Sequence, residues 1–167
     1  MKLLLSLTLV TAVECGTSLA NEQWSQFRGP EGNGHINSTS LPLKWSQNKN
    51  VAWKTPVHNR GWSSPVIWNN QIWMTTATKD GKKMFALCVD KKTGKILHDI
   101  HVFDVKNPQA ITIDNTYASP TPVIEEGRVY VHFGTYGTAC IDTSNGNIVW
   151  TRRDLKGDHE TGAGPAS

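Results

Sequence analysis

The sequence predicts an all-β fold in which two copies of one four-stranded antiparallel unit follow each other along the chain. Residues 88–98 align without a gap on residues 140–150, and residues 64–67 align on residues 121–124. No stretch shows the 3.6-residue apolar spacing that predicts an amphipathic helix. Short strands that recur at a period of about 50 residues are typical of the blades of a β-propeller. We therefore expect a partial β-propeller of about two four-stranded antiparallel blades.

The two copies differ in length at one place, where an insertion is easily accommodated. The offset between them is 57 positions from Ser64 to Thr121 but 52 positions from Cys88 to Cys140. The five extra residues of the first copy fall around 79–82, where Lys-Asp-Gly-Lys predicts a hairpin loop. Loops tolerate insertions better than strands do, so the gap supports the alignment.

Each copy is expected to alternate strands with short turns. β-Branched and aromatic residues favour the strands, and Asn, Asp and Gly favour the turns between them. The strands expected in the first copy are 66–68, 72–77, 83–89 and 96–102. The strands expected in the second copy are 123–124, 129–133, 135–141 and 148–152.

A fixed pattern spans the last turn of each copy. In the second copy it reads Cys140-x-Asp142-x-x-x-Gly146-x-x-x-Trp150. The Asp can accept backbone N–H bonds within the turn, and the Gly can adopt a positive φ. A Trp on an outer strand can lie flat against the neighbouring blade. The small Cys would leave room for the next blade's ring.

This pattern resembles the tryptophan-docking motif of the pyrroloquinoline-quinone (PQQ)-like β-propeller family, which usually begins with Ala and has Thr-Gly in the turn. The second copy departs from it with Asn145 in place of Thr. The first copy has Cys88, Asp90, Thr93 and Gly94, but His98 in place of Trp. The resemblance covers residues 50–153.

The opening of the chain is also similar to a subset of exported PQQ-like proteins. It reads Trp24-x-x-Phe27-Arg28-Gly29-Pro30-x-Gly32-x-Gly34, which by itself indicates an irregular, Gly- and Pro-rich lead-in with two aromatic anchors. Residues 51–55 look like the end of a blade and resemble 148–152. In such propellers an N-terminal strand often completes the last blade, so we expect residues 51–55 to be a closing strand.

The expected domain organisation follows from these repeats. It comprises a signal peptide (1–20), a lead-in segment with the closing strand (21–60), a first blade with its linker (61–116), a second blade (117–157) and the start of a truncated third blade (158–167). Two blades cannot close a ring of four to eight, and residues 164–167 resemble the openings at 61–65 and 117–120. We expect a piece of a longer protein; the alternative is a short chain that builds a ring from several copies.

The first segment indicates export to the periplasm or the extracellular space. Lys2 precedes an apolar run at 3–13, which is shorter than the roughly 20 residues of a membrane span. Ser18-Leu19-Ala20 has the small residues that signal peptidase requires. A buried strand or a membrane anchor is the alternative, and a lipoprotein acylated at Cys15 is disfavoured by the preceding Glu14.

Composition excludes two classes of partner. The formal net charge is only +3 and the basic residues are scattered, so a nucleic-acid-binding surface is not expected. No later apolar run is long enough to span a membrane. Cys88 and Cys140 occupy the same place in the two copies, which favours buried thiols over a disulfide or a metal site.

The sequence indicates no catalytic, cofactor-binding or metal-binding residues. Asp158-His159-Glu160 is the one cluster of potential ligands, and it fits a solvated linker better than any known ligand pattern. Asp90 and Asp142 are explained by turn formation.

Three functional hypotheses remain. The first is a non-catalytic scaffold that binds other proteins through propeller loops, similar to the PQQ-like lipoprotein of the outer-membrane assembly machinery. The second is a piece of a quinoprotein dehydrogenase. Its PQQ and calcium would bind only in the complete propeller, which this chain would form together with the remaining blades of the full-length protein. The third is a carbohydrate- or ligand-binding module that uses exposed aromatics such as Trp62 and Tyr117.

Cleavage of the signal peptide gives a first testable prediction. We expect the secreted protein to begin at Asn21, because signal peptidase cuts after small residues such as Ala20. N-terminal sequencing of the secreted protein measures this directly. A mature protein that begins with Met1 or with a lipid-modified Cys15 would contradict the assignment.

Overall fold

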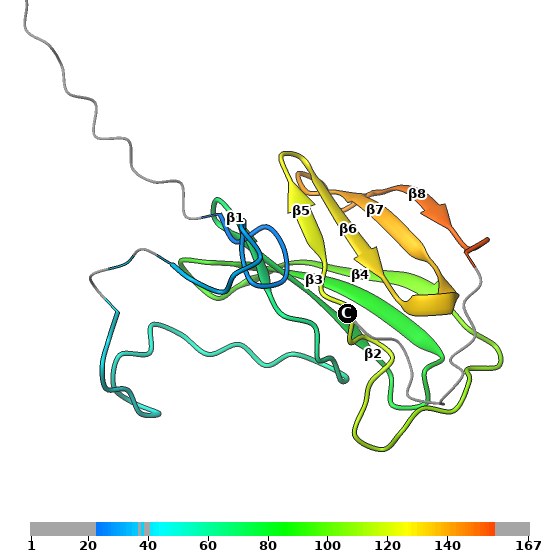
Figure 1. Ribbon diagram of the computed structural model, residues 1–167, viewed down its shortest axis with the longest axis horizontal. Coiled ribbons are helices and arrows are strands. Elements are labelled where there is room, and N and C mark those ends of the chain that lie inside the picture. Colours follow the sequence, from blue (N-terminus) through cyan, green and yellow to red (C-terminus); the bar gives the residue numbers. More distant parts are fainter. Residues whose placement is uncertain (1–22, 37, 39–40, 156–167) are drawn as a thin grey trace, which may run out of the picture.

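The computed structural model describes residues 23–36, 38 and 41–155. These residues form an all-β partial propeller of two four-stranded antiparallel blades, one lying over the other (Figure 1). Blade 1 consists of β1 (Val66–Trp68), β2 (Gln71–Ala77), β3 (Lys83–Asp90) and β4 (Ile96–Asp104). Blade 2 consists of β5 (Val123–Glu125), β6 (Arg128–His132), β7 (Thr138–Asp142) and β8 (Ile148–Arg152). In both blades the strands lie side by side in sequence order.

The strand register repeats from one blade to the next, which confirms the predicted alignment. In blade 1, Cys88 lies between Trp73 and His98 across three neighbouring strands. In blade 2, the corresponding row is Tyr130, Cys140 and Trp150. A β-bulge follows each cysteine, so that the outer strand gains one residue at the same place in both blades. The two copies therefore share this bulge as well as their strands, and blade 1 has a further register shift between Met84 and Phe85.

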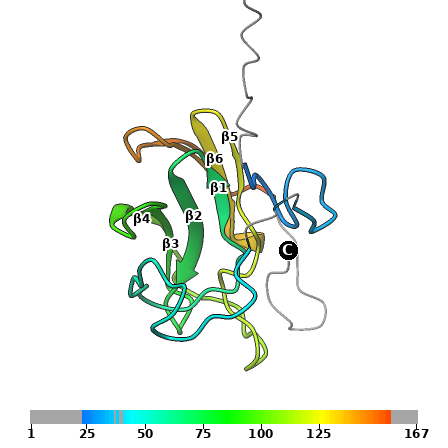
Figure 2. The same ribbon diagram turned by 90° about the vertical axis from the view of Figure 1, so that its left-hand side faces the viewer.

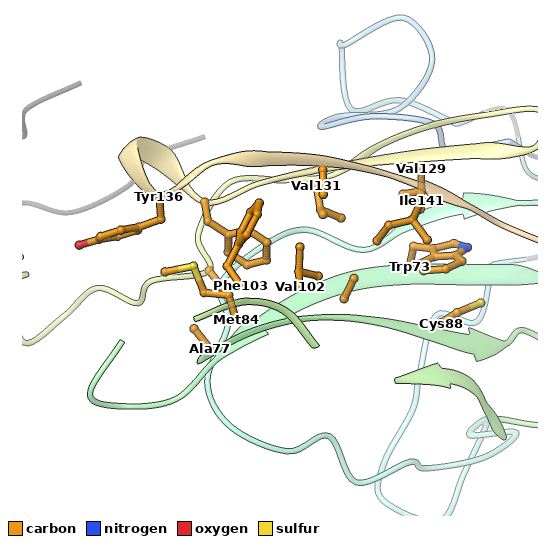
Figure 3. Close-up of a cluster of buried hydrophobic side chains, with 14 of the residues drawn as sticks. Trp73, Ala77, Met84, Cys88, Val102, Phe103, Val129, Val131, Tyr136 and Ile141 are labelled. Atoms are coloured by element: carbon orange, nitrogen blue, oxygen red, sulfur yellow. The ribbon is translucent and has the colours of Figure 1, made fainter. Parts of the chain in front are cut away.

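The core lies between the two blades and is built from one face of each sheet. In Figure 3, Val129, Val131 and Ile141 of blade 2 point toward Trp73, Val102 and Phe103 of blade 1. Most of this cluster is fully buried, and the rings of Phe103 and Phe133 meet edge to face at 5.9 Å. Burial of apolar surface between the sheets is the main favourable term for their association. Each blade thus buries an apolar face of the other, which would be unfavourable if it were exposed to water.

The turn between the last two strands has the predicted structure in both blades. Asp90 Oδ1 accepts hydrogen bonds from the backbone amides of Lys92 and Thr93, at 3.0 and 2.7 Å. Asp142 Oδ1 accepts one from the amide of Ser144 at 2.9 Å. The pKa of both carboxyl groups is lowered, chiefly by side-chain hydrogen bonds from Thr93 and Ser144. The predicted role of the two aspartates in turn formation is confirmed.

One strand begins later than expected. Residues 135–141 were expected to form a single strand, but Thr135 belongs to a 3₁₀ helix, Gly134–Tyr136, and β7 starts at Thr138. The amide of Phe133 donates to the carbonyl of Gly137 at 2.9 Å, which closes the hairpin there. The buried Tyr136 accepts a hydrogen bond at its hydroxyl from the amide of Gln109 at 2.8 Å. This tertiary contact accounts for a turn where strand propensity alone predicts continuation.

The lead-in segment joins the inner edges of the two blades (Figure 2). Trp24 exchanges two backbone hydrogen bonds with Ile67 of β1, at 2.9 and 2.8 Å, and the carbonyl of Ser25 accepts one from Ile124 of β5. The expectation of two aromatic anchors is wrong in part. Trp24 is partly buried and its ring packs on Gly29, whereas the side chain of Phe27 is 50% exposed.

Replacing Gly146 with Ala should destabilise the protein for two reasons. Gly146 has φ +76°, and a Cβ there would lie 2.8 Å from Nδ1 of His98. We expect a loss of roughly 1–2 kcal/mol in the free energy of unfolding from the left-handed backbone, plus about 1 kcal/mol or more from the clash. Urea denaturation measures the sum.

Gly127 provides the matched control for this substitution. It has φ +75°, but no atom lies within 4 Å of the position that a Cβ would take there, so Gly127→Ala should show only the backbone term. In a His98→Ala background the extra cost of Gly146→Ala should disappear. Equal losses for the two glycine variants would show that the His98 contact does not fix the blades.

Candidate functional site

The two blades are joined where a ring of blade 1 rests on a glycine of blade 2. His98, on β4, lies against Gly146 in the turn between β7 and β8. The His98 ring also stacks on Trp73, with ring centroids 5.7 Å apart and planes 20° apart. Nearby, the side-chain amide of Gln71 donates to the carbonyl of Thr143 at 2.8 Å. Blade 1 therefore contacts blade 2 through a stacked aromatic pair on blade 1 and a turn glycine on blade 2.

The same arrangement occurs one step earlier in the chain. Trp53 lies against Gly94, where a Cβ would come within 2.6 Å of the indole ring. The indole N–H of Trp53 donates to the carbonyl of Lys91 at 2.9 Å. The expectation of a strand at residues 51–55 is wrong, since these residues are irregular, and Trp53 reaches this turn from irregular chain. That these residues close a ring stays a prediction.

The face of blade 2 that points away from blade 1 is equivalent to the face of blade 1 that blade 2 covers. Val129, Val131 and Ile141 face blade 1, and side chains alternate along a strand, so the intervening residues face the other way. We call this surface the outer face of blade 2. Its central row consists of Val123, Tyr130, Cys140 and Trp150, in register across the four strands.

The aromatic residues of the outer face are partly exposed but ordered by their neighbours. The rings of Tyr130 and Trp150 meet above Cys140 with centroids 6.1 Å apart, and Trp150 is 43% exposed. The hydroxyl of Tyr130 donates to Glu125 Oε1 at 2.6 Å, and this bond to a carboxylate raises the pKa of Tyr130 to about 12. The outer face is therefore an apolar patch whose rings are held in place.

A charged row borders this patch at the blade's turn end. Arg128 Nη1 lies 2.8 Å from Asp142 Oδ2, and the strand register places Arg128 between Glu125 of β5 and Asp142 of β7. The ion pair is partly exposed, so its contribution to stability is small. Its effect is to fix the polar rim of the face in one geometry.

Both cysteines are free and buried, as expected from their equivalent places. Burial raises the pKa of the Cys88 thiol to about 12 and also raises that of Cys140. The rings that cover each thiol differ from the expectation. They come from the neighbouring strands of the same blade, because the register places Cys88 between Trp73 and His98, and Cys140 between Tyr130 and Trp150.

Of the two aromatic residues proposed as ligand contacts, only one is exposed. Trp62 is 59% exposed, but Tyr117 is buried, with 7% of its surface accessible. The Tyr117 hydroxyl donates to the carbonyl of Gln109 at 2.6 Å, and its ring packs on Gly81. The expectation of an exposed Tyr117 is therefore wrong, because the linker between the blades folds around it.

Potential metal ligands do not gather in the part of the chain that the structure describes. There, no three His, Cys, Asp or Glu side chains form a group that could hold a metal ion. His58 Nε2 lies 3.0 Å from both carboxylate oxygens of Asp99, and His101 lies 3.2 Å from Asp104. The Asp158-His159-Glu160 cluster lies outside the described residues.

Two further observations bear on the class of protein. Within residues 23–36, 38 and 41–155, no helix is long and apolar enough to cross a membrane. A scan against models of known protein families gave no match, and a search of curated proteins gave no significant match.

Sequence reasoning missed one group of residues, Arg60 and Lys79, which line a common pocket. Arg60 exchanges two backbone hydrogen bonds with Ala77, at 3.1 and 2.8 Å, and this bridge brings the end of β2 beside the lead-in segment. Nothing in the repeat alignment marks either residue. Their proximity is a product of tertiary structure.

Removing the Trp150 ring should uncover Cys140. We expect Trp150→Ala to raise the rate of Cys140 alkylation about tenfold, because reactivity needs an accessible thiolate. Cys88, beneath Trp73 and His98, should remain unreactive in the same molecule and serves as an internal control. Mass spectrometry of iodoacetamide-labelled protein measures both sites.

Val149→Ala is the matched substitution for this test. Val149 is 50% exposed and lies beside Trp150 on β8, but the bulge leaves it outside the row that covers Cys140. Equal acceleration in both variants would mean that β8 frays and that the ring does not protect the thiol.

Proposed function

We propose that this chain belongs to an exported PQQ-like β-propeller repeat protein that acts as a non-catalytic interaction scaffold. In this proposal partner proteins bind at the propeller loops, and the outer face of blade 2 packs against a further sheet of the propeller. The observation that carries it is the repetition of one docking surface. The row of Tyr130, Cys140 and Trp150 occupies on blade 2 the register positions that Trp73, Cys88 and His98 occupy on blade 1, and the blade 1 row is covered by a sheet.

The composition of the outer face supports packing against another sheet. Val123 and Trp150, at the two ends of the central row of this face, are 47% and 43% exposed. Contiguous exposed apolar surface marks sites of protein interaction, and Trp and Tyr are enriched among residues that dominate binding energy. Because the rings are already ordered, little side-chain entropy is lost on binding.

The partner expected at this face is a four-stranded sheet that presents an Asp-x-x-x-Gly turn. Two such turns are seen in this chain, and each receives a ring from the preceding segment, Trp53 on Gly94 and His98 on Gly146. Trp150 is the third ring in the series. A turn without a Cβ lets an indole lie flat on the backbone, which an alanine would prevent.

The family assignment within this proposal rests on the turn motif. Asp90 and Asp142 cap their turns, Gly94 and Gly146 have φ of +74° and +76°, and a ring lies against each glycine. Export rests on residues 1–20, which lie outside the described residues.

A chain extended by one blade tests the docking surface. A second copy of residues 61–105 would follow Ser167 directly, so that Trp150 could dock on the Gly94 turn of the added copy. We expect Trp150→Ala to cost about 2 kcal/mol more in the extended chain than in the original, because only there is the ring buried. Replacing the added Gly94 with Ala should remove the difference, as measured by urea denaturation and a double-mutant cycle.

Trp45→Ala is the control in both chains, since Trp45 is 69% exposed and lies in the lead-in segment. An equal cost of Trp150→Ala in the two chains would contradict docking at the outer face. The non-catalytic part is tested separately by incubating the exported protein with PQQ and Ca²⁺. We expect no quinone absorbance to remain with the protein after gel filtration, and bound quinone would favour the dehydrogenase hypothesis.

A further inference from the structure

A pocket of about 270 Å³ opens at the end of blade 1 opposite the turn that holds Trp53. One wall is the bridge between Arg60 and Ala77 together with the start of the β2–β3 turn, Thr78 and Lys79. The other wall is formed by residues 110–113 and 115–117 of the linker between the blades. The pocket shares no residue with the outer face of blade 2.

The charge of this pocket is one-sided. Arg60 and Lys79 are the charged residues that line it, and no carboxylate is among the lining residues. Within the described part of the chain neither cation has an ion-pair partner. Asp80 lies next to Lys79 in sequence, but its Oδ1 accepts hydrogen bonds from the hydroxyl of Thr78 and the amide of Lys82.

Two positive charges on one small concave surface attract an anion, and low-dielectric walls focus the field. An Arg guanidinium presents a planar fork of donors that matches a carboxylate or phosphate, and a Lys ammonium adds a second point charge. Asp80 and Asp114 are neighbours in sequence of the lining residues Lys79 and Asn115 but do not line the pocket, so the lining itself has the charge of an anion site.

The walls of the pocket are fixed before any ligand enters. The Tyr117 ring packs on Gly81 in the β2–β3 turn, which joins the two walls at one point. The Tyr117 hydroxyl donates to the carbonyl of Gln109 at 2.6 Å, and the amide of Gln109 donates to the hydroxyl of Tyr136 at 2.8 Å. Preorganised walls reduce the entropy lost on binding.

The remaining lining residues set the size and character of the ligand. Ile111 and Ala77 provide apolar surface, and Thr112 provides a polar group. A volume of about 270 Å³ is slightly below the range of pockets for drug-sized ligands, which fits a molecule the size of a monosaccharide.

We propose that this pocket binds a small organic anion of monosaccharide size, with its carboxylate or phosphate between Arg60 and Lys79. The rest of the ligand contacts Ile111 and Tyr117. The inference is independent of the docking surface, because the two sites lie on different parts of the fold.

Titrating the full chain with sugar acids tests this site. Glucuronate and glucose 6-phosphate are the anionic probes, and glucose is the neutral probe of similar size. In ¹⁵N NMR spectra at low salt, we expect at least one anionic probe to shift the amides of Arg60, Lys79 and residues 111–117, and glucose to shift none. Raising the salt concentration should weaken binding, because exposed charges are screened.

Arg60→Gln and Lys79→Gln should each weaken the binding about tenfold, since each removes a charge-assisted contact. Lys95→Gln is the matched control, because it removes an exposed cation from the turn at the other end of blade 1. Unchanged spectra with both anions, equal shifts with glucose, shifts that map to other residues, or full binding by Arg60→Gln would each overturn the proposal. The two glutamine variants keep all backbone contacts, and their amide spectra without ligand report whether they fold.

Discussion

The contact between a ring and a turn glycine determines how the sheets of this protein sit on one another. His98 can lie on Gly146 only because no Cβ intervenes, and the positive φ of that glycine is what turns the chain back into β8. One residue thus shapes the turn and admits the neighbouring ring. The apolar core between the blades follows from this placement, because it aligns Trp73 with Ile141 and Phe103 with Phe133.

The contact between a ring and a turn glycine is directional, because one segment supplies the ring and the next supplies the glycine. This direction matters for the proposed function. Each blade uses its turn to receive a ring from the preceding segment and its outer strand to offer a ring to the next surface. Blade 1 does both, through Gly94 and His98. Blade 2 receives His98 and presents Trp150 on an exposed face. In such a series, one end has a turn glycine that can receive a ring, and the other end has a ring that can contact a further glycine. The outer face of blade 2 is therefore a more specific surface than its exposed apolar area alone would indicate.

The sequence predicted those features that depend on local chemistry and on repetition. The strands, the Asp-capped turns and the equivalence of Cys88 with Cys140 all follow from patterns that occur twice in the chain. The features it missed depend on residues that meet only in the folded protein. Tyr117 is buried because Gly81 and Gln109 close on it, and Arg60 joins Lys79 through a single bridge to Ala77. Both contacts form only in the tertiary structure, so comparison of the two copies along the sequence could not reveal them.

The two surfaces that we propose as binding sites rest on one internal support. Arg153, directly after β8, donates from Nε to the carbonyl of Tyr136 at 3.0 Å and from Nη2 to the carbonyl of Asp104 at 3.1 Å. Its guanidinium also lies 5.0 Å from the centroid of the Phe103 ring. Tyr136 in turn contacts Gln109, and Gln109 contacts Tyr117 in the wall of the pocket. The end of the strand that bears Trp150 is therefore tied through four residues to the pocket lined by Arg60 and Lys79. Because these links are hydrogen bonds between ordered groups, they fix the position of the apolar face relative to the cationic pocket. The two surfaces nevertheless remain separate, so that occupation of one does not block the other.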